Sequence, residues 1–255
     1  MSSAIIIKSP HEIDLMRVAN SIVAETLGLI KDNIKIGVTT KELDELAEES
    51  AKKNGAFPAF KGYRGYPASI CISINEQVVH GIPSKKRTLK DGDLVSVDFG
   101  VKYKGFYGDA AFSIVVGTCS NEKKKLLAVT RQSLYLGIEQ ARAGNRVSDI
   151  SAAIQSCVEE QNLYVVKQFV GHGIGAKLHE PPEVPNYVRS GHSQRLMAGM
   201  VLAIEPMVNM GSSEVEVLSD GWTVVTKHRT LSAHFEHTVL ITEDNPQILS
   251  GSIKV

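Results

Sequence analysis

The sequence predicts an α+β fold built from two related halves. Stretches with the apolar spacing of amphipathic helices precede stretches rich in β-branched residues, and this order occurs twice along the 255 residues. Five pairs of similar residues are each separated by 107 positions: Gly37 and Gly144, Leu43 and Ile150, Leu89 and Leu196, Gly92 and Gly199, and Asp98 and Glu205. Chance explains any one pair, but five at one offset favour an internal duplication. We therefore expect a single domain over residues 1–255, with halves of about 1–117 and 118–255 and a ligand site between them.

The first half is expected to contain two helices followed by strands. Residues 10–31 place apolar side chains at helical spacing behind Ser9 and Pro10, a pair typical of a helix start. A second helix over residues 40–53 should stop at Asn54 and Gly55. Stretches of β-branched residues broken by glycine predict strands over residues 69–75, 93–102 and 105–116.

The second half repeats this order. Helical spacing covers residues 121–142 and 148–162. Strands are expected over residues 164–170, 201–210, 223–227 and 234–242. The repeated order of helix, helix and strands is the second reason to regard the halves as related.

Composition limits the class of protein. A hydrophobic share of 43% supplies a packed core, and a formal net charge of zero argues against a general binder of polyanions, so the short basic runs at 85–87 and 123–125 are expected to be solvated faces. Three widely spaced cysteines without a Cys-x-x-Cys motif favour free thiols in a reducing compartment. The N-terminal apolar run is too short for a signal peptide, and no segment reaches the length of a membrane span. A cytoplasmic protein is expected.

Two aspartates interrupt apolar strands of the first half. Asp98 lies in LVSVDFG and Asp109 in GFYGDAAFSIVV. Their connection through Tyr103, Lys104 and Gly105 is typical of a tight hairpin with a two-residue loop, which places both aspartates on the same face of the ladder. Burying unpaired carboxylates is costly, so two like charges on one buried face require a cation.

The second half makes the same demand. Glu205 ends the apolar run MVLAIEPMV, Glu236 precedes another in HFEHTVLIT, and His172 lies among glycines in VGHGIGAKLHEPP. Taken singly, each of these residues is better explained as an exposed or hydrogen-bonded polar group. Together, four carboxylates and one imidazole would nearly neutralise two divalent ions. An oxygen-rich set without thiolates suits Mn, Fe or Co, can also hold Zn, and argues against a structural zinc site.

Two further histidines have a similar placement. His80 in VVHGIP and His179 in LHEPP each precede a proline turn, upstream of Asp98 and Glu205 respectively. Each half would then supply one such histidine and two carboxylates. The remaining histidines are expected to be surface or supporting groups: His11, His192, His228, His234 and His237.

These residues stand in segments that resemble type I methionine aminopeptidase, a peptidase with the pita-bread fold. The segments span nearly the whole chain: GYRGYPASICISINEQVVHGIP, LKDGDLVSVDFGV, GFYGDAAFS, GHGIGAKLHEPPEVPNY, LMAGMVLAIEPMV and AHFEHTVLIT. The resemblance implies two pseudo-symmetric halves whose antiparallel sheets, covered by helices, surround a central site for two divalent metal ions per subunit (Co, Mn, Fe or Zn). It implies five metal ligands, Asp98, Asp109, His172, Glu205 and Glu236, with Asp109 and Glu236 contacting both ions.

The resemblance also implies the reaction, which is removal of the initiator methionine from nascent proteins and peptides with a small second residue. A hydroxide bridging two ions about 3.5–4 Å apart would attack the first peptide carbonyl. Glu205 would carry a proton to the leaving amine, His179 would stabilise the tetrahedral oxygen, and His80 would contact the scissile nitrogen. The methionine pocket would be lined by Tyr63, Tyr66, Cys71 and Trp222, because aromatic and sulfur groups suit a thioether. For Cys71, ordinary core packing explains the residue equally well.

Three positions depart from the family pattern. Phe60 stands where many relatives carry cysteine, and Leu178 stands where others have a bulkier residue. Gly100 replaces a small hydroxyl residue often found after the first aspartate. These changes affect the shape and hydrogen bonding of the pocket, and none of the five ligands is missing.

Two alternatives remain open. Proline-directed peptidases share the fold and a similar metal set, although they usually carry an extra N-terminal domain, whereas a helix is expected here from about residue 10. The long helical insertion of type II methionine aminopeptidases and an N-terminal zinc-binding extension are not expected either. A binding module that has lost catalysis would have replaced metal ligands. The expected partners are N-terminal methionyl peptides and nascent polypeptides, with transient ribosome association compatible with that role. We expect a monomer with no nucleic-acid or membrane partner.

Overall fold

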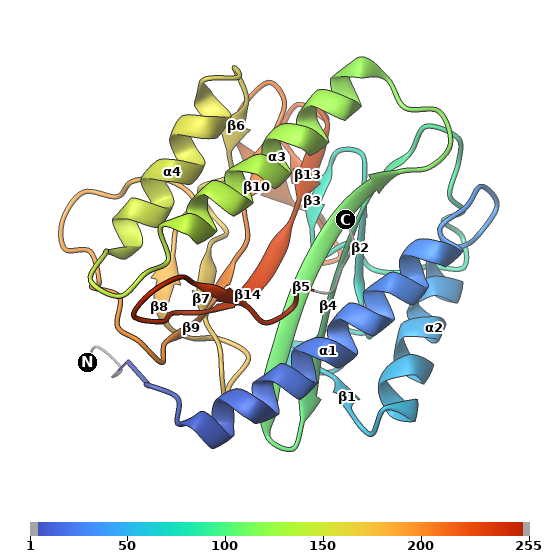
Figure 1. Cartoon of the computed structure of the whole chain (residues 1–255). Coiled ribbons are helices and arrows are strands. Elements are labelled where there is room, and N and C mark those ends of the chain that lie inside the picture. Colours follow the sequence, from blue (N-terminus) through green and yellow to red (C-terminus); the bar gives the residue numbers. More distant parts are fainter. Residues whose placement is uncertain (1–4, 252–255) are drawn as a thin grey trace.

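The computed structural model describes residues 5–251, so the outer ends of the predicted halves, including the first residues of the N-terminal segment, lie outside the described residues. Helices and strands follow one another in the predicted order (Figure 1). Within these residues the helices are α1 (Pro10–Asn33), α2 (Thr40–Lys53), α3 (Asn121–Glu139) and α4 (Val147–Glu159), together with a 3-10 turn, η1 (Tyr63–Gly65). The four predicted helices are confirmed, although α3 and α4 end a little earlier than expected.

Capping boxes fix the starts of α1 and α2. The Glu12 carboxylate accepts a hydrogen bond from the Ser9 backbone N–H at 2.7 Å, and the Ser9 side chain accepts one from the Glu12 N–H. Thr39 and Glu42 form the same reciprocal pair at the start of α2. Each box satisfies backbone donors that the first helical turn leaves without a partner. These local bonds explain why the helix starts could be predicted from the sequence.

The strands form one large sheet and two small ones, and all their pairings are antiparallel. The large sheet has the order β1 (Phe57–Pro58), β4 (Leu94–Tyr103), β5 (Phe106–Val115), β14 (Glu236–Leu240), β9 (Val201–Ile204), β7 (Gly171–Gly173) and β8 (Glu180–Val184), with β2 (Cys71–Ile74) on β4 and β15 (Gln247–Ile248) on β14. The small sheets are β13 (Ser232–His234), β10 (Met207–Asn209) and β6 (Tyr164–Val165), and β11 (Val215–Val217), β12 (Val224–Thr226) and β3 (Gln77–Val79). Because β5 pairs with β14, the large sheet runs continuously from one half of the chain to the other.

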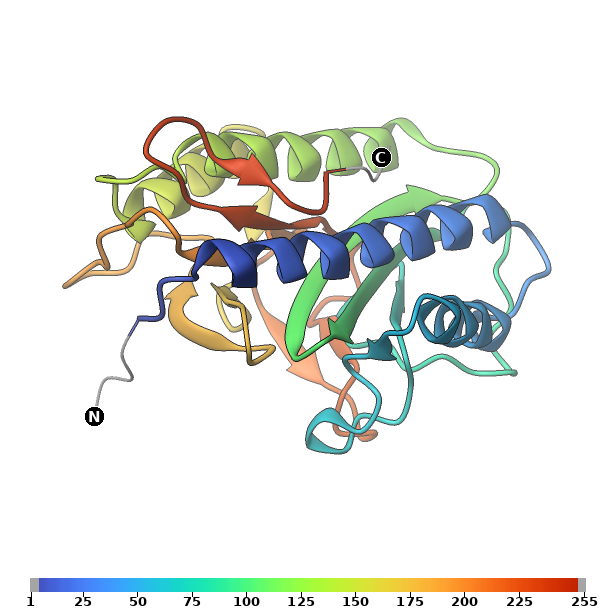
Figure 2. The same cartoon turned by 60° about the horizontal axis from the view of Figure 1, so that its bottom comes forward.

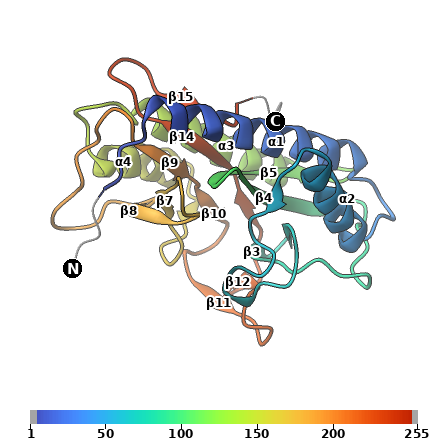
Figure 3. The same cartoon turned by 90° about the horizontal axis from the view of Figure 1, so that it is seen from below.

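The long helices gather on one side of the large sheet. Figures 2 and 3 show α1 and α3 on that side, with η1 and the β11–β12 hairpin on the opposite side. The core between helices and sheet is apolar and includes the fully buried Phe99 and Phe112 of the central hairpin. No helix within residues 5–251 is long and apolar enough to cross a membrane. This arrangement leaves one face of the sheet available for a site.

Residues paired by the 107-position offset make the same local contacts in both halves. The N–H of Gly37 donates to the Leu89 carbonyl at 2.9 Å, and the N–H of Gly144 donates to the Leu196 carbonyl at 3.0 Å. Both glycines have positive φ, which favours glycine at such turns. Isolated bridges also repeat, between Thr39 and Thr88 and between Arg146 and Arg195. These equivalent contacts support the internal duplication, which stays a prediction.

Three predicted strands are wrong in extent. The segment 201–210 divides into β9 and β10 because Pro206 has no N–H to donate to a ladder. The opposite segment, 234–242, divides at Phe235, whose N–H bonds the Pro206 carbonyl, so β14 stays in the large sheet while β13 pairs with β10. The segment 164–170 is a strand only at β6 because the chain then bends toward the site, where Phe169 and Val170 line a cavity.

Candidate metal centre

The β4–β5 hairpin presents two aspartates on one face, as expected. Lys104 and Gly105 form its two-residue loop with φ angles of 46° and 94°, the left-handed values that a tight hairpin turn requires. Asp98 lies opposite Ala111 and Asp109 lies opposite Gly100 in the ladder. The two aspartates are therefore diagonal neighbours on the same face of the sheet.

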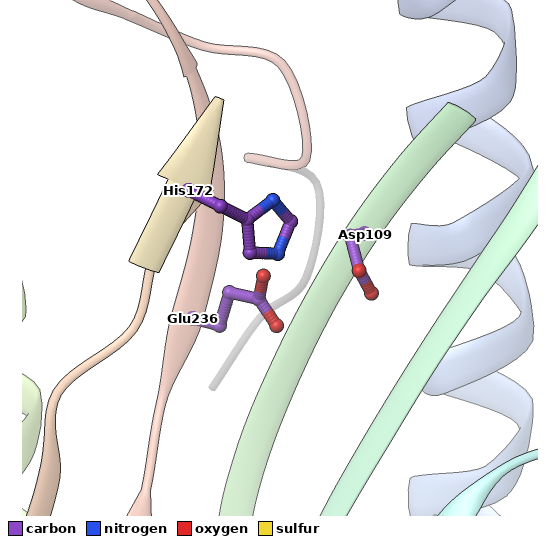
Figure 4. A group of neighbouring side chains, drawn as sticks. All are labelled: Asp109, His172 and Glu236. Carbon is purple, nitrogen blue, oxygen red and sulfur yellow. The ribbon is translucent and has the colours of Figure 1, made fainter. Parts of the chain in front are cut away.

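The remaining predicted ligands come from neighbouring strands of the same sheet. Glu236 opens β14 and pairs with Ala111, the cross-strand partner of Asp98. His172 lies in β7 opposite Ala203 of β9, and Glu205 directly follows β9. Ligand atoms of Asp109, His172 and Glu236 all lie within 4.8 Å of one another. Figure 4 shows these three side chains as neighbours that come from three strands.

Asp98 and Glu205 line the same cavity but lie outside this compact group of three. One oxygen each of Asp98, Asp109 and Glu236 is buried and has no hydrogen-bond partner among the described residues. A buried oxygen without a donor is costly, and a cation would satisfy it. The donor set of carboxylates and one imidazole, without a thiolate, fits divalent ions of the Mn, Fe, Co or Zn type.

Burial raises the pKa of all four carboxyl groups. It raises the pKa of Asp98 to about 7 and that of Glu205 to about 8. The pKa values of Asp109 and Glu236 lie well above the usual range, because burial adds to repulsion from the neighbouring carboxylates. Without a cation, these groups bind protons at neutral pH in order to avoid sharing negative charge in one cavity.

His172 is held as a neutral ligand candidate. Its Nδ1 is 2.9 Å from the Gly173 carbonyl, and burial lowers its pKa to about 3. Its other nitrogen, Nε2, is 3.6 Å from a Glu205 oxygen and is left for a ligand. A neutral imidazole with one nitrogen fixed by a carbonyl is the form that binds metal ions.

His234 is the residue that sequence reasoning underestimated. It is 2% exposed, and its Nε2 lies 3.6 Å from the second oxygen of Glu205 and has no hydrogen-bond partner among residues 5–251. Glu205 therefore lies between two histidine nitrogens. His237 is also buried, with Nδ1 2.9 Å from the Ser250 hydroxyl, whereas His11, His192 and His228 are exposed. Only the position of His234, two residues before Glu236, gives a signal in the sequence.

All the predicted site residues line one cavity of about 280 Å³. The carboxylates lie against one wall, and the rest of the lining is mostly apolar. Tyr66 is held by hydrogen bonds from its hydroxyl to the carbonyls of Ile70 and Gly81, and its ring meets Trp222 edge to face at 5.1 Å. Cys71 is buried and lies opposite Asp98 in the ladder, so it is placed both in the wall and beside the carboxylates.

The two candidate catalytic histidines lie at different depths. His80 is half-buried with a positive φ of 60°, meets Phe169 and Trp222 edge to face, and has its pKa lowered by burial to about 4. His179 is exposed at the mouth, where its Nδ1 is 2.9 Å from the Tyr63 hydroxyl and its ring is 4.2 Å from that of His172. Burial against its neighbours, with the nearby Arg64 charge, lowers the pKa of His179. The lowered pKa values favour the neutral form of both rings near pH 7.

Two of the departures from the family pattern explain each other. A Cβ on Gly100 would lie 3.0 Å from Asp109 Oδ1 and 3.1 Å from the Phe60 ring. The large Phe60 therefore occupies space that a side chain at position 100 would need. The third departure, Leu178, is 2% exposed and lines the cavity beside His179.

Comparisons with known proteins agree with this geometry. Residues 14–243 match the family profile described as Metallopeptidase family M24. The methionine aminopeptidase of Clostridium perfringens is 56% identical over 246 residues, which cover 96% of this chain and 98% of that protein. The solved methionine aminopeptidase of Thermotoga maritima has a TM-score of 0.95 at 46% identity, covering 97% of this chain and 99% of that chain. A prolidase from Pyrococcus furiosus has a TM-score of 0.78 at 24% identity, covering 96% of this chain and 65% of that one, and so shares the fold alone. The predicted pita-bread fold is confirmed.

The pKa shifts predict that the metal-free protein loses thermal stability as the pH rises from about 6.5 to about 8.5. Asp98 and Glu205 have folded-state pKa values of about 7 and about 8, so the folded protein holds protons that the unfolded chain has released. The stabilisation of the folded state by these bound protons is therefore present at low pH, and it is lost as the pH rises through the two folded-state pKa values. The buried histidines have lowered pKa values, so they change the stability of the fold mainly at pH values below this range.

Thermal unfolding in chelator at pH 6.5, 7.5 and 8.5 checks this expectation. Saturating Mn²⁺ should remove the dependence because the ions replace the protons. In the metal-free protein, Glu205→Gln should make the melting temperature fall less steeply with pH, because the amide does not titrate. A metal-free melting temperature that is constant or rises with pH would contradict the prediction.

Gly100→Ala should weaken metal binding by about tenfold or more, because the new methyl group crowds the Asp109 carboxylate at 3.0 Å. Calorimetric titration of the metal-free protein with Mn²⁺ measures the change. Gly28→Ala is the matched control, because its Cβ would meet no atom within 4 Å. Equal affinities in wild type and Gly100→Ala would show that the carboxylate is not held in place by this close approach.

Proposed function

The chain belongs to metallopeptidase family M24, and from this premise we propose that it removes the N-terminal methionine from proteins and peptides whose second residue is small. It is a hydrolase, a metal-dependent exopeptidase that cleaves the first peptide bond. The observation that carries the proposal is the placement of the carboxylate and histidine group at one wall of a cavity whose other walls are aromatic, aliphatic and sulfur-bearing.

The family implies divalent metal ions, and we propose that this site binds two. Their ligands would be Asp98, Asp109, His172, Glu205 and Glu236, with Asp109 and Glu236 reaching both ions. The buried oxygens without donors support this assignment. When bound, such ions activate water and polarise the scissile carbonyl. Co, Mn, Fe and Zn are all compatible with these donors.

The chain's own groups complete the reaction. His179, at the mouth and oriented by the Tyr63 hydroxyl, would donate a hydrogen bond to the oxygen on which charge develops. His80, neutral and held between aromatic rings, would contact the scissile nitrogen. Glu205 would carry the proton to the leaving amine. Its location at the cavity, with one oxygen 3.6 Å from Nε2 of His234, supports that role because this buried nitrogen has no other partner among residues 5–251.

The cavity walls support methionine as the first residue. Tyr66, Trp222 and Cys71 offer aromatic edges and a polarizable sulfur, which make favourable contacts with a thioether. The hydrogen-bonded pair of Tyr63 and His179 stands at the mouth, where the second residue of the peptide would lie. A large second side chain would crowd this pair, which supports the preference for a small one.

Proline-directed cleavage is the main alternative within this fold. The likeness to a prolidase extends to the fold alone, whereas the Clostridium perfringens relative matches over nearly the full length of both chains. That relative's high identity supports methionine rather than an X-Pro bond as the point of recognition.

We place the enzyme in the cytoplasm as a monomer, acting on nascent polypeptides, with transient ribosome association as an expectation of that role. Three free cysteines support a reducing compartment. A monomer is supported because side chains of one chain line the whole cavity.

Purified metal-loaded protein should release methionine from Met-Gly and Met-Ala peptides. Met-Leu and Met-Phe peptides should be cleaved more slowly, because their second side chains crowd the mouth. A side-by-side assay with X-Pro peptides supplies the comparison. Preference for X-Pro would replace the present proposal with a proline-directed peptidase.

Asp109→Ala should lose divalent metal and activity together, since Asp109 belongs to the compact group and would reach both ions. Metal content by mass spectrometry after dialysis against buffered Mn²⁺ checks this. Glu243→Ala, which removes an exposed carboxyl, is the matched control. Full metal occupancy in Asp109→Ala would exclude the two-ion site, and full occupancy with no peptidase activity in wild type would favour a binding module.

A further inference from the structure

A buried ion pair connects the N-terminal end of the described chain to the loop that carries His179. Lys8 Nζ lies 2.6 Å from Glu180 Oε2, across 172 residues of sequence. The two side chains are only 3% and 1% exposed. Removing one partner of such a pair leaves an uncompensated buried charge, so the surrounding structure depends on both.

The lysine is held by a segment that we call the N-terminal strap, residues 5–9. The Lys8 backbone N–H donates to the Gly199 carbonyl at 2.8 Å, and its Nζ also donates to the Ile6 carbonyl at 3.0 Å. A Cβ on Gly199 would lie 2.6 Å from Ile7, and one on Gly175 would meet the end of the Lys8 side chain. Two glycines therefore leave room for the strap to pass.

The glutamate closes a segment that we call the histidine loop, residues 174–179, between β7 and β8. Glu180 Oε1 accepts a hydrogen bond from the Lys177 N–H at 3.0 Å while Oε2 accepts from Lys8. At its other end the loop is tied to β5, where the Tyr107 N–H donates to the Gly175 carbonyl. The backbone on both sides of His179 is thus fixed by neighbours of the loop.

His179 meets two neighbouring rings, stacking on Tyr63 at 5.3 Å and lying 4.2 Å from His172. Its ring is exposed, and its side chain makes one hydrogen bond, to the Tyr63 hydroxyl, among residues 5–251. The ring contacts come from side chains of other elements, and the backbone beneath His179, which begins β8 at Glu180, sets where the ring meets them.

We propose that Lys8 is a positioning residue, which acts through Glu180 to hold the histidine loop so that His179 faces the reacting peptide bond. The proposal rests on the proposed aminopeptidase function for the role of His179. Lys8 contacts neither the cavity nor the carboxylate group, so its effect on catalysis passes through the loop. The N-terminal strap thereby helps to position a side chain of the site, although the site residues lie far from it in sequence.

A double-mutant cycle tests the pair. Lys8→Met should lower kcat between about tenfold and about a hundredfold with a smaller change in KM, because a displaced His179 affects the transition state more than substrate binding. Lys8→Met combined with Glu180→Gln should recover part of the loss, because the amide carries no charge and can still accept from Lys177. Lys227→Met, which removes an exposed ion pair with Glu214, is the matched control and should retain wild-type kcat.

A His179→Ala background separates positioning from general damage. If Lys8 acts through His179, Lys8→Met should lower kcat by a much smaller factor in the His179→Ala background than in the wild-type background. Equal costs in both backgrounds, wild-type kcat in Lys8→Met, or loss of bound metal in Lys8→Met would each overturn the proposal.

Hydrogen exchange gives a readout that needs no activity. In metal-loaded Glu180→Gln, which keeps the size and one acceptor of the side chain, amides of the histidine loop should exchange faster. The amides of β5 should not, apart from that of Tyr107, which is bonded to the loop. This measurement also serves if Lys8→Met does not fold. Unchanged exchange in the loop would overturn the proposal even if methionine peptides are cleaved, whereas X-Pro preference with faster loop exchange would overturn only the proposed function.

Discussion

Mutual repulsion among four carboxyl groups at one cavity, of which those of Asp109 and Glu236 are buried, is the constraint on which the rest of this structure depends. Burial together with neighbouring negative charge raises the pKa values of Asp109 and Glu236 well above the usual range. Such a cluster favours expansion of the cavity unless protons or cations neutralise it. The surrounding backbone must therefore be rigid enough to hold the charges together. Part of this rigidity comes from side-chain bonds that extend the β5–β14 pairing, since Thr238 of β14 donates its hydroxyl to the Asp109 carbonyl and accepts from the Asp109 N–H.

The ladder also explains why the site lies where the two halves meet. β5 belongs to the first half and β14 to the second, and their pairing brings Glu236 beside Ala111 and hence beside Asp98. Ser113 extends this link, since its hydroxyl donates to the His234 carbonyl and accepts from the His234 N–H. Neither half could assemble the cluster alone, because each contributes only two of the carboxylates. The cluster is therefore assembled only where β5 and β14 are paired.

Local interactions determine how much of this could be predicted from the sequence. The starts of α1 and α2 follow from capping boxes within four residues, and the facing of Asp98 and Asp109 follows from a two-residue loop. The short strands β3, β7, β8 and β11 gave no usable pattern because each is only three to five residues long, and β7, β8 and β11 contain glycine, proline or charged residues. β3 lacks such residues, but its partner β12 lies far away in the sequence. His234 and the Lys8–Glu180 pair were missed for the same reason. A polar residue in a sequence is expected to be exposed, and its burial is stable only when partners distant in sequence compensate for the lost hydration.

Strands hold the metal-ligand candidates and loops form most of the substrate walls, which explains why one fold occurs in peptidases of different selectivity. Asp98, Asp109, His172 and Glu236 lie within strands of one sheet, and Glu205 directly follows one, so their spacing is set by ladder geometry that sequence change alters little. The walls that meet the substrate come largely from η1, from the histidine loop and from the segment around Trp222, whose shapes depend on side chains such as Phe60 and Leu178. Gly100 lies where the carboxylate-bearing strands meet the cavity wall, because any side chain there would press on both Asp109 and Phe60. Pocket shape can therefore change only where such contacts leave the carboxylates undisturbed, and an enlarged wall residue requires a reduced one beside it.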